Sequence, residues 1–240
     1  MSLQKFALRS AFHAIAVAFT LGAAAVLPGY AAAQVAPSPS EVTALAGLHA
    51  AAHKGDVAQI EKLAAAKADL NAKAANGRTP VHVATFARQR EALRALAKAG
   101  ANLNLLENDR YDGITIASVA DDEETLRVLI ELGASAKQTT SRYDGTALIA
   151  AAHLGHDGVV RQLIKAGAPL DHVNNLHWTA VIESIVLGDG GRRHQATLKA
   201  LIDAGANLQL KDRTGATPLQ LARSRGYAEM VKMLEAAGAK

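Results

Sequence analysis

The sequence predicts an all-α repeat solenoid of about six helix-turn-helix repeats with projecting hairpin turns, and three observations support this prediction. A glycine-alanine pair closes successive amphipathic segments, at spacings of 33, 34, 38 and 33 along the chain. A threonine recurs upstream of each pair. Aromatic residues make up only 4% of the 240 residues, so closely packed alanine-rich helices must supply the core. The pairs are Gly100-Ala101, Gly133-Ala134, Gly167-Ala168, Gly205-Ala206 and Gly238-Ala239.

The threonine and the glycine are predicted to mark the two ends of each helix pair. Threonine caps a helix start, and glycine adopts the left-handed conformation that stops a helix. The distance between them is 21 in three repeats, 18 after Thr115 and 26 after Thr179. These spacings predict a deletion in the third repeat and a five-residue insertion in the fifth. The opening threonines are Thr79, Thr115, Thr146, Thr179 and Thr217.

Residues 1–33 have the pattern of a secretory signal peptide. Two basic residues, Lys5 and Arg9, precede an apolar stretch, and small residues precede a cleavage junction after Ala33. The alternative is a membrane anchor, but the apolar stretch is marginal in length and ends at Pro28-Gly29. We therefore expect a periplasmic or secreted protein that has no contact with a membrane after cleavage.

Residues 34–40 read QVAPSPS and are predicted to form an extended linker. Two prolines and the absence of periodic apolar positions support this interpretation. Helical structure is expected to begin near Ser40, which is a suitable helix cap.

The last repeat carries the resemblance to a known family. The segment DRTGATPLQLARSRGYAEMVKMLEAAGA, Asp212 to Ala239, resembles the ankyrin repeat nearly position for position. The family also has a period of about 33 residues. A weaker copy spans 48–71, with Lys67 where glycine is expected. The resemblance covers Ser40 to Lys240 and implies an exported bacterial ankyrin-repeat protein with its repeat domain over 41–240. Its repeats would run roughly over 41–73, 74–106, 110–140, 141–173, 174–211 and 212–240.

Charge and cysteine content exclude several classes of function. The formal net charge is +4, and residues 1–33 contribute two of these units, so the remainder lacks the dense basic face that nucleic-acid binding requires. No cysteine is present, which excludes disulfides and thiolate chemistry.

The resemblance implies that binding side chains lie at the hairpin tips and at two positions near the end of each first helix. Large rigid aromatic residues are common interface anchors, so the aromatic residues among these positions are the strongest candidates. The tip candidates are Asn76, Arg78, Tyr111, Asp112, Tyr143, Asp144, Asn175, Leu176, Trp178, Arg213 and Thr214. The first-helix candidates are His53, Lys54, Phe86, His153, Leu154, Val186, Leu187, Ser224 and Arg225.

Exposure of the tip aromatics decides whether they can bind a partner. Tyr111 and Tyr143 both lie in a YDG turn, and we expect both to be exposed. Trp178 stands beside a helix-opening threonine, where exposure and packing against the adjacent tip are equally expected.

The histidines suggest a metal site, but the repeat pattern explains most of them. His49 and His82 occupy the family's TPLH position, whose imidazole bonds to the backbone of the neighbouring turn. His153 and His156 have ligand-like spacing, yet a glycine intervenes and no third ligand is specified. We therefore expect no metal and no cofactor, and interpret His153 as a binding residue.

The insertion GDGGRRH, 188–194, is the one irregular segment with functional potential. Its glycines and arginines suggest a phosphate-binding loop, but such a loop normally follows a strand and this one joins two helices. It is either a solvated loop or a specific contact loop, with Asp189, Arg192 and Arg193 as the candidate contacts.

These observations predict a monomeric protein-binding scaffold or adaptor that is not an enzyme. It would act in the periplasm or outside the cell, for example in support of an exported enzyme or envelope complex. One alternative is a secreted effector that binds a host protein. A small-ligand, metal-binding or hydrolytic protein that uses the histidines or the insertion is a third.

Overall fold

The computed structural model describes residues 36–240, and the predicted signal peptide lies outside this range. The described residues form thirteen α-helices and one short 3-10 helix, η1, over Ala75–Gly77. The α-helices are α1 Pro39–Ala44, α2 Gly47–Lys54, α3 Val57–Ala65, α4 Pro80–Phe86, α5 Arg90–Ala99, α6 Gly113–Val119, α7 Glu123–Glu131, α8 Ala147–Leu154, α9 Asp157–Lys165, α10 Ala180–Val186, α11 Arg192–Asp203, α12 Pro218–Ser224 and α13 Ala228–Ala236.

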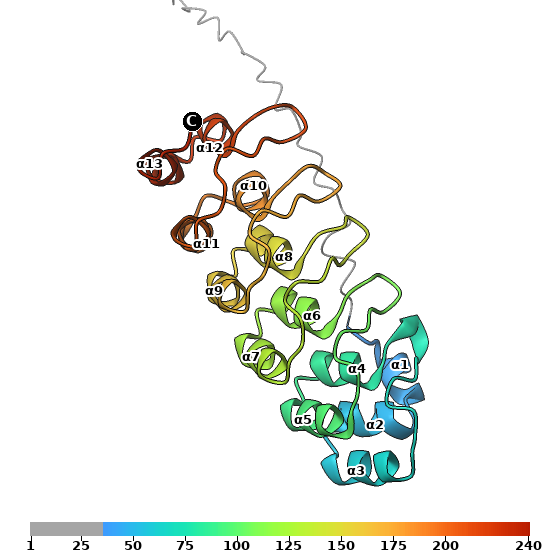
Figure 1. Cartoon of the computed structure of the whole chain (residues 1–240). Coiled ribbons are helices and arrows are strands. Elements are labelled where there is room, and N and C mark those ends of the chain that lie inside the picture. Colours follow the sequence, from blue (N-terminus) through green and yellow to red (C-terminus); the bar gives the residue numbers. More distant parts are fainter. Residues whose placement is uncertain (1–35) are drawn as a thin grey trace, which may run out of the picture.

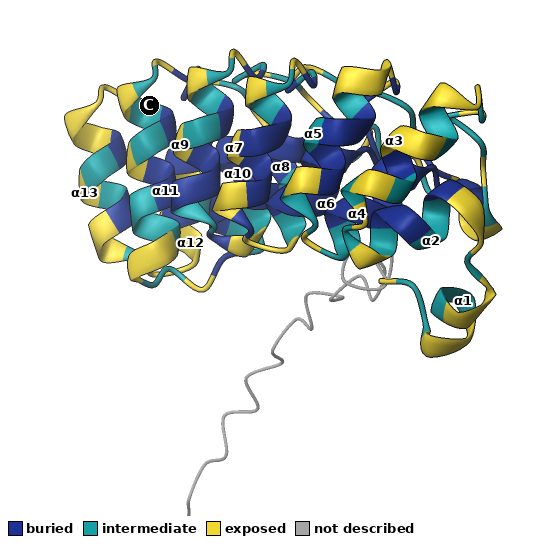
Figure 2. Cartoon of the chain, turned by 90° about the horizontal axis from the view of Figure 1, so that it is seen from below, coloured by how far each residue is buried: buried dark blue, intermediate teal, exposed yellow. Residues whose placement is uncertain are grey.

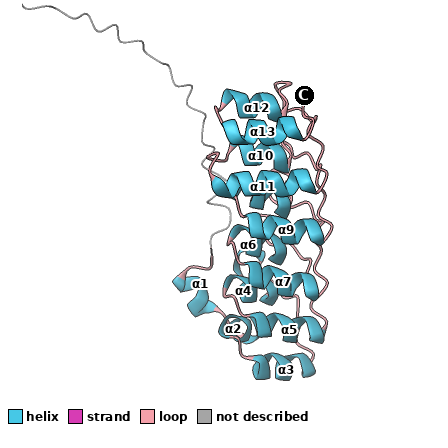
Figure 3. Ribbon diagram, turned by 90° about the vertical axis from the view of Figure 1, so that its left-hand side faces the viewer, coloured by secondary structure: helices cyan, strands magenta, loops and turns pink. Residues whose placement is uncertain are grey.

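From α2 onward the helices form six antiparallel pairs that stack in a single row (Figure 1). The inner helices α2, α4, α6, α8, α10 and α12 pack successively on one another, and the outer helices from α3 to α13 do the same. Hairpin loops project from one side of the row (Figure 1), and the helix axes lie roughly parallel (Figure 3). Two helical layers with loops along one edge confirm the predicted all-α repeat solenoid.

The hydrophobic core is a continuous layer between the inner and outer helices (Figure 2). One leucine of each outer helix lies at an equivalent position, and five of the six are fully buried: Leu96, Leu129, Leu163, Leu201 and Leu234. Leu63, in the first repeat, is only half-buried because no repeat covers its outer side. Each repeat therefore depends on its neighbours to bury its apolar faces.

The structure shows that the third repeat does not contain the predicted deletion. Helix α6 begins at Gly113 and is capped by Asp112, whose carboxylate accepts a hydrogen bond of 2.7 Å from the amide of Thr115. Aspartate thus replaces threonine as the cap, and the distance from Asp112 to Gly133 equals that from the capping threonines to their glycines in the regular repeats. The repeat has full length, and the prediction that Thr115 opens its helix was wrong.

The start of the described chain also differs from expectation. Helix α1 begins inside the predicted linker, because Ser38 caps it and forms a capping box with Glu41. Glu41 then contacts the hairpin tip of the second repeat, where one of its oxygens accepts a hydrogen bond of 2.6 Å from Asn76 Nδ2 and lies 3.6 Å from Arg78 Nη1. The short helix therefore packs beside the tip of the second repeat.

Candidate functional site

Three of the hairpin tips are tight turns that the side chain of the first residue organises. Glu107 Oε1 accepts hydrogen bonds from the amides of Asp109 and Tyr111 at 2.9 and 3.1 Å. Asn174 and Asp212 hold their tips through the same pair of amides. The fourth tip is one residue longer, from Thr140 to Gly145, which accounts for the larger spacing of 34 in the sequence.

Adjacent tips are joined into one ladder by backbone and side-chain contacts. The amides of Asn108, Ser141 and Asn175 each donate to a carbonyl of the preceding tip at 2.9 to 3.0 Å. Two reciprocal ion pairs, Arg110 to Asp144 at 2.9 Å and Arg142 to Asp109 at 3.1 Å, connect the third and fourth tips. These contacts fix the tips relative to one another and pair four of their charged side chains.

Three predicted tip candidates are buried rather than available to a partner. Tyr111 is only 4% exposed, and burial raises its pKa to about 12, so the expectation of an exposed Tyr111 was wrong. Asp112 is the buried cap of α6, and burial raises the pKa of its carboxyl. Arg78 is 7% exposed and lies over the ring of Phe86, 4.8 Å from its centroid. Sequence spacing placed these residues at the tips but could not show that they are buried.

The remaining tip candidates keep part of their surface. Tyr143, Leu176 and Trp178 are half-buried. Asn76 and Arg213 are exposed, although each also makes a hydrogen bond, Asn76 to Glu41 and Arg213 to the carbonyl of Asn175. Asp144 is half-buried and paired with Arg110.

The inner helices present a row of apolar side chains beside the tips. We define this surface, the inner-helix face, by Phe86, Val119, Leu154, Val186 and Leu187. Leu154 is 36% exposed, and the other four are half-buried. His153 lies in the same row, between Val119 of α6 and Val186 of α10. The inner-helix face is thus apolar along its middle, with one histidine.

The histidines mostly bind backbone carbonyls, as the repeat pattern predicted. His82 Nε2 donates to the carbonyl of Tyr111 at 3.0 Å, and His49 Nε2 lies 3.0 Å from the carbonyl of Arg78. His156 Nδ1 lies 2.9 Å from the carbonyl of Ser118. No group of three metal-ligating side chains is found within residues 36–240.

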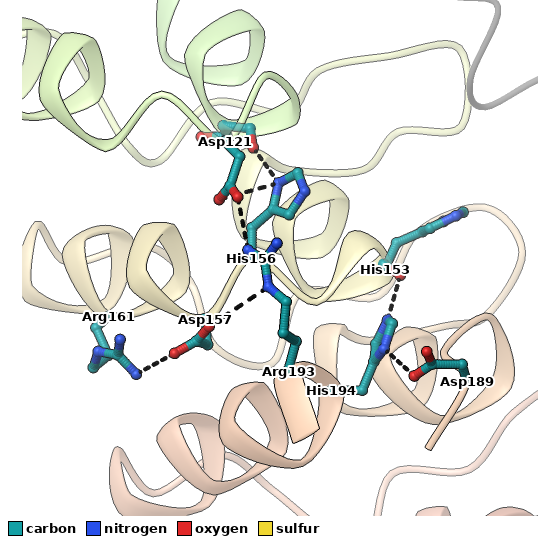
Figure 4. A network of polar contacts seen from close by, with 9 residues as sticks. Asp121, His153, His156, Asp157, Arg161, Asp189, Arg193 and His194 are labelled. Carbon is teal, nitrogen blue, oxygen red and sulfur yellow. Dashed lines mark hydrogen bonds and ion pairs between the residues drawn. The ribbon is translucent and has the colours of Figure 1, made fainter. Parts of the chain in front are cut away.

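The insertion forms contacts between repeats instead of an open loop (Figure 4). Arg193 lies 2.7 Å from Asp121 of the third repeat and 3.9 Å from Asp157 of the fourth. His194 contacts the carbonyl of His153 at 2.9 Å and Asp189 at 2.8 Å. The hydrogen bond from the Gly191 amide and, as a smaller cause, the one with His194 hold the pKa of Asp189 below its usual range.

Both ring nitrogens of His194 therefore face oxygen atoms, one of a side chain and one of the backbone. Of the three predicted contact residues, Asp189 and Arg193 belong to this network. Arg192 is exposed and takes no part in it.

Sequence reasoning missed Glu183, which is fully buried on α10. Its Oε1 accepts a hydrogen bond of 2.8 Å from Asn174 Nδ2, and its Oε2 lies 3.4 Å from His153 Nδ1. The signal was available, because the equivalent positions of other repeats carry apolar residues or alanine. A carboxylate there conflicts with the repeat pattern.

The architecture defines a helical repeat protein with a ladder of hairpin tips, and the family comparisons agree. A model of ankyrin repeats (3 copies) matches residues 114–212 and 148–240, and a model of ankyrin repeats (many copies) matches residues 48–97. The chain belongs to the ankyrin-repeat family. Ankyrin repeat domains generally bind proteins and are typically not enzymes.

Bacterial proteins are among its relatives. The chain is 40% identical over 100 residues to YahD of Escherichia coli (strain K12), which is named as an ankyrin repeat protein. This match covers 41% of the chain and 50% of YahD, so the chain spans half the length of this curated relative.

Solved structures extend the comparison. The crystal structure of an ankyrin repeat domain from Acinetobacter baumannii AYE has 43% identity and a TM-score of 0.76, over 80% of this chain and 98% of that one. The ankyrin repeat domain of human ASB11 has 22% identity and a TM-score of 0.64, over 82% of this chain and 85% of that one. At this identity the likeness supports the fold and nothing further.

Within residues 36–240, none of the helices has the length and apolar character needed to span a membrane.

Proposed function

We propose that this protein is an exported protein-binding scaffold that holds its partner on the inner-helix face, in the periplasm or outside the cell. The observation that carries the proposal is the row of incompletely buried apolar side chains on that face. Leu154 is one of two exposed large hydrophobic residues in the described chain, the other being Val173. Apolar surface that the fold leaves accessible in a continuous row is typical of an interaction site.

The rigid setting of this face supports binding. The ladder of tips and the stacked inner helices hold the row in place, so a partner would meet side chains that are already ordered. Preorganised surfaces lose less conformational entropy on association. Trp178 and Tyr143, half-buried at the hairpin tips, supply the aromatic character that interface anchors commonly have.

Export is the second part of the proposal and depends on the sequence pattern of residues 1–33. Mass spectrometry of the full-length chain, expressed in its own cells with a carboxyl-terminal tag, should give a mature protein that begins at Gln34. Retention of Met1 in a membrane fraction would contradict export but not partner binding.

Binding is tested with a matched pair of variants in the same tagged protein. Leu154→Glu places a charge on the inner-helix face, and Lys165→Glu places the same side chain on outer helix α9 of the same repeat. We expect a protein that the wild type captures from the envelope fraction to be lost with Leu154→Glu and kept with Lys165→Glu. Equal capture by both folded variants would place the interface elsewhere.

A further inference from the structure

The first repeat differs from the other five because it has no hairpin tip within the described residues. In the second to sixth repeats, a tip precedes the inner helix. In the first repeat the chain enters α2 directly from the short helix α1, and only Leu45 and Ala46 lie between the two helices. Helix α1 lies at the side of the stack (Figure 3). The place beside the second tip, where a tip of the first repeat would lie, is therefore bordered by α1 instead.

A groove lies at this place. It has a volume of about 450 Å³ and is lined by α1, by His49 of α2 and by the start of the second tip, Lys73 to Ala75. Its volume falls within the range of ligand-binding clefts, so it can hold a short peptide segment. Four of its lining residues are alanine, and Lys73 and Glu41 carry opposite charges. The groove therefore favours an uncharged segment with small or apolar side chains.

The second residue of each tip is the point at which adjacent tips are joined. In the third, fourth and fifth tips its amide donates to a carbonyl of the preceding tip at 2.9 to 3.0 Å. In the sixth tip the side chain of Arg213 donates instead, to the carbonyl of Asn175 at 2.7 Å. Ala75 is the equivalent residue of the second tip, and its amide has no hydrogen-bond partner among residues 36–240. Because Ala75 is also exposed, the ladder ends in an accessible main-chain donor that lines the groove.

Both sides of the groove are held in place by hydrogen bonds. The carbonyl of Asn76 accepts a hydrogen bond of 2.9 Å from the amide of Asn108, which fixes the second tip to the third. On the other side, Glu41 of α1 accepts a hydrogen bond of 2.6 Å from Asn76 Nδ2. Helix α1 buries none of its residues, so polar contacts with the second tip hold it as a wall of the groove. A segment that enters meets ordered groups, which lowers the entropic cost of binding.

We propose that this groove binds an extended, uncharged segment of a partner protein, and that a main-chain carbonyl of the segment accepts a hydrogen bond from the Ala75 amide. The segment takes the place of the missing first tip and extends the ladder by one member. Main-chain pairing at an open edge supplies affinity, while the groove walls select the side chains. No residue of the inner-helix face lines the groove, so this interaction is independent of the proposed function.

A single substitution removes the donor and leaves the groove in place. Proline has no amide hydrogen, needs a φ of about −65° and follows extended residues readily. Ala74 is extended, with φ −89° and ψ −161°, and Ala75 is not among the residues of positive φ. Ala75→Pro should therefore fold, which circular dichroism checks. Ala75→Ser, which copies Ser141 of the fourth tip and keeps the amide, is the matched control.

The probe is a random peptide library displayed on phage. The library is depleted on Ala75→Pro and then selected on the purified wild-type protein, which enriches peptides that need the open donor. Selected peptides should be uncharged and apolar. In calorimetric titrations Ala75→Pro should bind them at least about fivefold more weakly than wild type, because the peptide carbonyl is left without a donor. Ala75→Ser and Leu154→Glu should bind them as the wild type does.

Hydrogen exchange of the Ala75 amide, followed by NMR, tests the contact itself without a variant. This amide should exchange rapidly in the free protein and at least about fivefold more slowly when a selected peptide saturates the groove. If Ala75→Pro does not fold, the selection omits the depletion step and this measurement decides.

Four outcomes would overturn the proposal. No peptide is recovered, or the recovered peptides leave exchange of the Ala75 amide unchanged. Slow exchange in the free protein would mean that this chain or a second copy already fills the groove. Loss of binding with Leu154→Glu would place the peptides on the inner-helix face. The first three outcomes leave the proposed function untouched, and the fourth supports it, so the two proposals fail separately.

Discussion

At the scale of single residues, hydrogen-bond partners and burial determine the protonation state of His82. His82 is 1% exposed, and its Nδ1 accepts a hydrogen bond of 3.1 Å from the amide of Thr79. Nε2 must therefore carry the hydrogen that it donates to the carbonyl of Tyr111. Burial lowers the pKa of His82 from 6.5 to about 4, so the folded protein holds the neutral ring.

The lowered pKa of His82 predicts a loss of stability in acid. His82 takes up a proton near pH 6.5 in the unfolded chain but only near pH 4 in the folded chain. The stability that neutral His82 contributes is therefore complete above pH 6.5 and is lost as the pH falls from 6.5 to about 4. The shift corresponds to roughly 3 kcal/mol between the two ends. His82→Gln, which copies Gln220 of the last repeat, should flatten the dependence of unfolding free energy on pH.

Denaturant titrations of both proteins at about pH 7 and about pH 4 measure this difference, since all other titrating groups are shared. The wild type should lose more stability than His82→Gln. Parallel losses would show that His82 is not the group responsible.

The two tip tyrosines should separate folding from binding. Tyr111 is buried between adjacent tips, so Tyr111→Ala leaves a cavity and should lower the unfolding free energy by about 2–4 kcal/mol. Tyr143 is half-buried, and Tyr143→Ala should cost stability by about 1 kcal/mol or less while weakening capture of the partner. Thermal denaturation and partner capture, measured on both variants, distinguish the roles. A large stability loss from Tyr143→Ala would make it a structural residue as well.

At the scale of elements, capping chemistry explains which parts of the fold the sequence predicts. Threonine caps and closing glycines predicted most helix pairs, because both act through local backbone geometry. Asp112 caps α6 by the same mechanism, yet a search for threonine alone missed it and implied a deletion. The site was less predictable than the fold. Burial of Tyr111 and the contact between Glu183 and His153 depend on side chains of a neighbouring repeat, which local sequence patterns do not bring together.

The insertion provides a prediction at this scale. Arg193 joins it to the third and fourth repeats by ion pairs, but its side chain is 55% exposed, so water and salt screen them. Arg193→Ala should lower the unfolding free energy by about 1 kcal/mol or less, and the loss should shrink at high salt. Tyr227→Phe removes a neutral hydrogen bond of 2.8 Å to the carbonyl of Gly188 in the same insertion.

Because neutral hydrogen bonds are little affected by salt, the Tyr227→Phe loss of about 0.5–1.5 kcal/mol should persist at high salt. Chemical denaturation with urea, which adds no ionic strength, compares the two variants at low and high salt. An Arg193→Ala loss that is independent of salt would mean that the arginine stabilises the insertion by packing.

At the scale of the whole molecule, stability comes from a one-dimensional stack. Helices pack on the helices of adjacent repeats, and the buried layer runs the length of the row (Figure 2). Such proteins are stabilised by the sum of their repeats and interfaces, and an end repeat can open while the rest stays folded. The contact between Glu183 and His153 lies between the fourth and fifth repeats, where both repeats have neighbours on each side. That position keeps the contact away from the ends of the stack, where fraying begins.

The stack predicts that the position of a core mutation changes its effect even when burial is the same. Leu163 and Leu234 are equivalent and both 0% exposed, but α9 packs between α7 and α11 whereas α13 packs against α11 and its own partner α12. Leu163→Ala should lower the global unfolding free energy by about 2–5 kcal/mol. Leu234→Ala should shift the global transition less and increase hydrogen exchange mainly in the last repeat, because that repeat can unfold alone. Equal global losses, with exchange raised throughout the chain in both variants, would show that the repeats unfold as a single cooperative unit.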